Sequence, residues 1–74
     1  MALKLTESDI ETARDFGSRA AIARHQGDES RAHEHTLYIR RLINLYDKED
    51  ADKLHAAFND AYKEESKYYY NRGY

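Results

Sequence analysis

Apolar residues recur along the chain at the three- and four-residue spacing of amphipathic helices. The first stretch places Ile10, Ala13, Gly17, Ala20 and Ala21 on one face. Since 3.6 residues complete a helical turn, residues at these spacings share a side. The pattern predicts a helix over about 7–26. Its stripe of small side chains lets another helix approach closely but offers little area for burial.

Two further stretches repeat the spacing with larger side chains. The second, over about 29–46, carries Ile39, Leu42, Ile43 and Tyr46 within an apolar arc of nearly half the circumference. The third, over about 49–70, places one apolar or aromatic face along the helix: Ala51, Leu54, Phe58, Ala61, Tyr62 and Tyr69. An all-α fold follows: 29–46 and 49–70 pack as an antiparallel hairpin, and 7–26 lies alongside in a three-helix bundle. Because the second arc is the widest, we expect 29–46 to be the central element of a single domain spanning 1–74.

The residues between the stretches indicate where the helices begin and end. Thr6 followed by Asp9 is a variant of the capping box that starts many helices. Gly27 suits the left-handed position that follows a helix, and Asp28 suits the cap of the next one. Asp47 is the corresponding cap for the third helix. With no proline in the chain, no kink is predicted.

Composition limits how large a core the chain can build. A domain of 74 residues buries only about 60% of its unfolded surface. The sequence has no Val, Trp or Cys, and it is rich in tyrosine, with seven. Disulfide and thiolate–metal cross-links are therefore excluded. We expect the core to be completed by a homodimer or by a protein partner.

The formal net charge of −2, with both signs interleaved, is typical of solvated helix surfaces. Strong non-specific binding to nucleic acid needs a clustered basic surface. The chain shows no secretory leader pattern and no apolar run of membrane-spanning length. A cytoplasmic location is the resulting expectation.

Candidate catalytic and metal-binding patterns are weak. His33 and His35 are two residues apart, so on a helix they point in different directions and do not share an ion easily. The acidic run after Asp47 lacks the glycine and the final glutamate of a calcium loop. No phosphate-binding glycine loop is present. We therefore predict no enzymatic activity, no cofactor and no metal.

The C-terminal tyrosines are the sharpest functional candidate. Tyr68, Tyr69 and Tyr70 are consecutive, so on a helix they cannot all face one core. Tyrosine and arginine dominate the residues that contribute most to protein–protein binding. The predicted function is a non-enzymatic protein-binding module, acting as a small inhibitor or adaptor that sequesters a larger host protein. The predicted contact residues are Leu37, Arg40, Arg41, Tyr68, Tyr70 and Tyr74.

Two alternatives remain open. The first is a small nucleic-acid-binding protein that uses Arg40, Arg41, Lys67 and Arg72 together with stacking on the tyrosines. The second is an oligomer that sequesters a small ligand between its subunits.

The stretch 23–32, with its Gly27-Asp28 pair followed by Ala32, resembles the inter-helix turn of a tetratricopeptide repeat. A solenoid needs at least about three repeats, so the resemblance implies one helix–turn–helix unit. In size and texture the chain is also similar to small helical bacteriophage accessory proteins that act in host takeover or against host defence. That resemblance implies binding and inhibition of a host protein.

Overall fold

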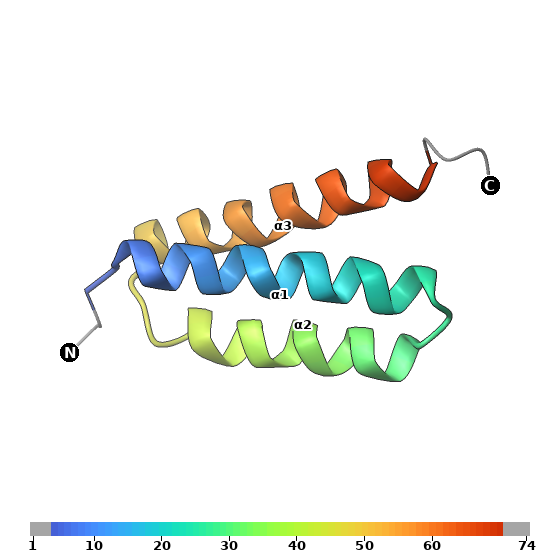
Figure 1. The fold of residues 1–74 in the computed structure, drawn as a ribbon. Helices are drawn as coiled ribbons and strands as arrows, with labels where there is room; N and C mark the ends of the chain where they lie inside the picture. The colour runs from blue at the N-terminus through green and yellow to red at the C-terminus, as the bar shows by residue number, and fades with distance from the viewer. Residues whose placement is uncertain (1–3, 71–74) are drawn as a thin grey trace.

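The computed structural model describes residues 4–70, and the side chains of residues 4–68. Within that range the chain forms three α-helices: α1 (Glu7–His25), α2 (Glu29–Ile43) and α3 (Lys48–Tyr70). Consecutive helices run in opposite directions (Figure 1). The bundle is elongated, measuring 46 × 22 × 17 Å. The predicted all-α, three-helix architecture is confirmed.

The start of α1 is the capping box that the sequence predicts. The Thr6 hydroxyl accepts a hydrogen bond from the Asp9 amide at 3.3 Å. In return, the Asp9 carboxylate accepts one from the Thr6 amide at 3.0 Å. Two of the amides left without helical partners at a helix start are thereby satisfied.

The turn from α1 to α2 is also as predicted. Gly27 adopts a φ of 82°, the left-handed conformation that glycine reaches without a Cβ clash. The amide of Gly27 donates to the Arg24 carbonyl at 3.1 Å, and the amide of Asp28 donates to the Ala23 carbonyl at 2.8 Å. These two bonds form a Schellman motif. The Asp28 carboxylate then caps α2 by accepting from the Arg31 amide at 3.0 Å.

The end of α2 differs from the prediction. The helix ends at Ile43 rather than near residue 46. Two single turns follow, in which the amides of Leu45 and Tyr46 donate to the carbonyls of Leu42 and Ile43, each at 3.1 Å. These three-residue bonds tighten the chain, as helix ends often do. Leu45 therefore lies outside the regular helix, in the first of the turns that follow it.

The order of packing also differs from the prediction. Helix α1 lies between the other two and packs along both, whereas α2 and α3 barely meet (Figure 1). The expectation that 29–46 is the central element was wrong. The buried residues of α1 are Ala13, Gly17, Ala20, Ala21 and Ala23. Because these side chains are small, α1 accepts a neighbouring helix on each side of its stripe at close range.

The core of the described residues is correspondingly small. Leu54 is its one large side chain with no exposed area, and it clusters with Ala13, Ile39 and Ile43. Leu5 and Ile10 pack at the edge of this cluster. Burial is concentrated along the line of α1, so side chains on the far sides of α2 and α3 stay in contact with solvent.

Candidate interaction surfaces

Helix α2 presents an apolar surface to solvent, because only α1 packs along it. Tyr38 and Leu45 are each 53% exposed, and Leu37 is 36% exposed. Arg41 follows Leu37 by one turn and is also exposed. We call these four residues the outer face of α2, although Leu45 lies in the turn just after the helix. It holds three of the four large hydrophobic side chains that are exposed among the described residues.

An aromatic cluster centred on Phe16 of α1 packs against the Tyr38 side chain of this outer face. The rings of Phe16 and Tyr38 stack with centroids 4.5 Å apart and planes 19° apart. His35 meets Phe16 edge-on at 5.4 Å, and the Arg19 guanidinium lies 5.6 Å from the Phe16 centroid. Stacked and edge-on aromatic pairs stabilise a fold by more than the area they bury would predict. The cluster holds the exposed Tyr38 ring in a fixed position across the seam between α1 and α2.

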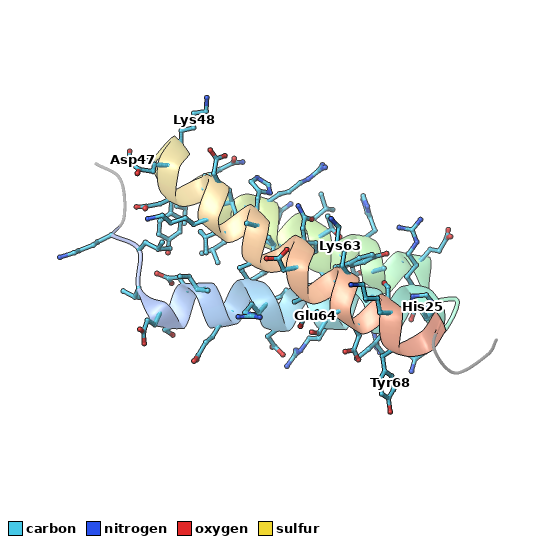
Figure 2. The ribbon with its side chains drawn as sticks, turned by 90° about the horizontal axis from the view of Figure 1, so that it is seen from above. His25, Asp47, Lys48, Lys63, Glu64 and Tyr68 are labelled. Carbon is cyan, nitrogen blue, oxygen red and sulfur yellow. The ribbon has the colours of Figure 1, made fainter. Side chains whose placement is uncertain are left out.

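The predicted contact residues are spread over three places. Leu37 and Arg41 lie on the outer face of α2, whereas Arg40, though exposed, lines a hollow on another side of that helix. Tyr68 is 53% exposed and extends away from the helices near the end of α3 (Figure 2). The side chain of Tyr70 and all of Tyr74 lie outside the described residues, as does Arg72. Their role in binding stays a prediction.

A trough runs between α2 and α3, floored by α1. Three hollows make it up, with volumes of about 260, 250 and 620 Å³. Thr36 lines the first and second hollows, while Arg24, Glu29 and Tyr62 line the first and third. The hollows are therefore neighbours along one channel. No local pattern in the sequence indicates this trough, because it exists only where α2 and α3 do not meet above α1.

The charged side chains of the trough walls are mostly basic, with Glu29 on α2 as the acidic exception. On the α2 side stand His33 and Arg40, and on the α3 side stand His55, Lys63 and Lys67. Figure 2 shows Lys63 and Glu64 projecting from different sides of α3. Only the former lines the trough.

Arg24 and Tyr62 meet across the floor of the trough. The Arg24 guanidinium Nη1 donates a hydrogen bond to the Tyr62 hydroxyl at 3.1 Å. The Tyr62 ring also stacks on Phe58, with centroids 6.4 Å apart. The Tyr62 ring is half-buried while its hydroxyl is hydrogen-bonded, which fits the amphipathic character of tyrosine.

Two described side chains have shifted pKa values: Asp9 in the first turn of α1 and Tyr46 in the segment after α2. Hydrogen bonding with the Thr6 side chain, and then with Tyr46, lowers the pKa of the Asp9 carboxyl from its usual value. Burial, and then Asp9, raises the pKa of the Tyr46 hydroxyl. This pair ties the start of α1 to the segment that links α2 to α3. The cap at Thr6 accounts for most of the lowering at Asp9, and burial accounts for most of the rise at Tyr46.

Other kinds of site find no support in residues 4–70. No three His, Cys, Asp or Glu side chains of that range converge to hold a metal ion. None of its helices combines the length and apolar character needed to cross a bilayer. Comparisons with protein-family models, curated proteins and solved structures find no match to this chain.

Proposed function

We propose that this chain is a non-enzymatic protein-binding module, which acts as a small inhibitor or adaptor through the outer face of α2. The observation that carries the proposal is the exposure of Tyr38 on α2 and of Leu45 in the turn after it, because only α1 packs along α2. Aromatic anchors near apolar neighbours and an arginine are the composition of strong protein–protein contacts. Arg41 supplies the arginine.

The size of the molecule is compatible with this role. A standard interface removes about 800 Å² from each partner. The accessible surface of the chain is 5632 Å², so one interface would cover about a seventh of it. Because the core holds few large side chains, covering Tyr38 and Leu45 would add apolar burial that the isolated chain lacks. Binding would therefore also stabilise the fold.

The distribution of polar groups favours binding over catalysis. Among the described residues, no polar or charged side chain is fully buried. Catalytic groups with shifted pKa values are usually found in desolvated pockets. The trough instead opens to solvent between α2 and α3. A surface that meets another macromolecule fits these features better than a reaction chamber.

Capture from a host lysate, with and without nuclease, tests the proposal when matched variants are compared. We expect the tagged chain to retain one stoichiometric protein after nuclease treatment. The double substitution Tyr38→Ala with Leu45→Ala should abolish that capture. Tyr68→Ala is the matched control, because Tyr68 is as exposed as Tyr38 but lies at the end of α3. Circular dichroism checks that all variants remain helical.

Two results would contradict this assignment. Loss of capture by Tyr68→Ala alone would move the contact to the C-terminal tyrosines. A homodimer in sedimentation that dissociates on Tyr38→Ala with Leu45→Ala would assign the outer face of α2 to a second copy of the chain. The sequence also predicts a homodimer, in which a second copy of the chain would cover the outer face of α2. Sedimentation distinguishes that homodimer from binding of a different protein.

A further inference from the structure

The trough between α2 and α3 has the form of a vacant helix position. Two helices flank it, and α1 forms its floor, where Ala20 is almost fully buried. Along α3 the lining extends from His55 to Lys67. At 1.5 Å per residue this length is about 18 Å, or a little over three helical turns. A fourth helix laid here would complete a four-helix arrangement.

The charge of the trough is opposite to that of the remaining chain. Its lining holds four Lys and Arg residues, and Glu29 is the one acidic residue. The whole chain has 12 basic and 14 acidic residues, so the remainder has 8 and 13, a formal charge of −5. Three of the four histidines also line the trough. The basic lining members are Arg24, Arg40, Lys63 and Lys67, and the histidines are His25, His33 and His55.

We propose that this trough binds an acidic amphipathic α-helix of a partner protein. Carboxylates on the two flanks of such a helix would meet Arg40 on α2 and Lys63 and Lys67 on α3. Its small or apolar side chains would approach Ala20 and the half-buried Phe58. The interaction combines charge complementarity with apolar contact beside Ala20 and Phe58, a variant of the helix-in-groove mode.

A nucleic-acid strand fits this surface less well. The trough is short, and a longer polyanion would continue over surfaces that carry the formal charge of −5. Repulsion there would oppose the attraction within the trough, since phosphate binding grows with the number of phosphates neutralised. An acidic helix of about three turns matches the length of the trough, so its carboxylates would not extend over the acidic surfaces beyond it.

The test uses a fluorescein-labelled helical peptide of about 20 residues, long enough to hold some helix in water. Glutamates occupy two flanks of the peptide, and alanine and leucine occupy the third. A matched peptide has glutamine in place of every glutamate. A single-stranded oligothymidylate of similar length is the polyanion probe. Fluorescence anisotropy measures binding of each probe to the full chain.

We expect the glutamate peptide to bind at least about tenfold more tightly than both other probes, because it alone combines carboxylates with an apolar stripe. Lys63→Glu with Lys67→Glu should weaken its binding by at least about tenfold. The control is Arg14→Glu with Lys53→Glu, which changes the net charge equally at exposed positions outside the trough. That control should change binding by less than about threefold.

Four outcomes would overturn the proposal. They are no binding of the glutamate peptide, equal binding of the glutamine peptide, equal weakening by the control variant, and tighter binding of the oligothymidylate. The proposal is independent of the outer face of α2. Tyr38→Ala with Leu45→Ala should leave peptide binding unchanged, so failure at one surface is distinguishable from failure at the other.

Discussion

Gly17 of α1 and the backbone carbonyl of Phe58 in α3 are in such close contact that no side chain fits between them. A Cβ atom at Gly17 would collide with the Phe58 carbonyl oxygen and would lie 3.2 Å from the Ala61 Cβ. The backbones of α1 and α3 are therefore almost in contact at this point. This contact explains how a stripe of small residues can hold the centre of the bundle.

Gly17→Ala should destabilise the protein, although alanine is the better helix former. Overpacking a close contact costs about 1–3 kcal/mol, whereas the gain in helix propensity is about 1 kcal/mol. Since the obstructing atom is backbone, α1 and α3 must separate to admit the methyl group. Thermal unfolding by circular dichroism should show a lower Tm. An unchanged or higher Tm would show that the crossing is not close enough to exclude a methyl group.

Gly27 should respond to substitution for a different reason. A Cβ there meets no atom within 4 Å, but the φ of 82° strains an L-residue. Gly27→Ala should cost about 1–2 kcal/mol through backbone strain alone. Gly27→Asn should cost less, because asparagine tolerates the left-handed region. Equal urea-unfolding midpoints for the two variants would argue against a backbone origin of the effect.

The features that the sequence predicts well are local ones. Thr6, Asp9, Gly27 and Asp28 act on chain neighbours within about one turn, so the residue types alone determine the caps. The helix periods follow from the same short-range spacing. The end of α2 was missed because the turns at Leu45 and Tyr46 continue the coil without a breaking residue.

Packing order could not be derived from the same information. A wide apolar arc was taken to indicate a central helix, which assumes that every large apolar side chain is buried. Tyr38 and Leu45 are instead about half exposed, so part of the wide apolar arc faces solvent rather than another helix. The trough exists because α2 and α3 each pack on α1 and barely meet one another, and contacts such as Gly17 with Phe58 join residues far apart in the sequence.

Leu54 should carry more of the stability than any other leucine with a described side chain. It is fully buried at the centre of the core cluster, so Leu54→Ala removes area and leaves a cavity. The expected loss is about 2–5 kcal/mol, a large share of what a small domain has. Leu37→Ala, at a position 36% exposed, should cost about 0.5 kcal/mol or less. Urea unfolding measures both, and comparable losses would contradict the assigned core.

The capping carboxylate of Asp9 should make stability depend on pH. Its pKa is lowered in the folded protein from an ordinary value of 3.8, chiefly by the Thr6 side chain. The folded state therefore holds the proton less readily than the unfolded state. The stabilisation is complete above the unfolded pKa and disappears as the pH falls through the folded pKa. Asp9→Asn removes the charge, so the Tm advantage of the native chain should be constant near neutral pH and should shrink below about pH 4. Thr6→Val, which removes the main hydrogen-bond partner, should reduce that pH dependence. A Tm difference between native chain and Asp9→Asn that is the same at about pH 7 and about pH 2.5 would mean that the carboxylate charge contributes nothing to the cap.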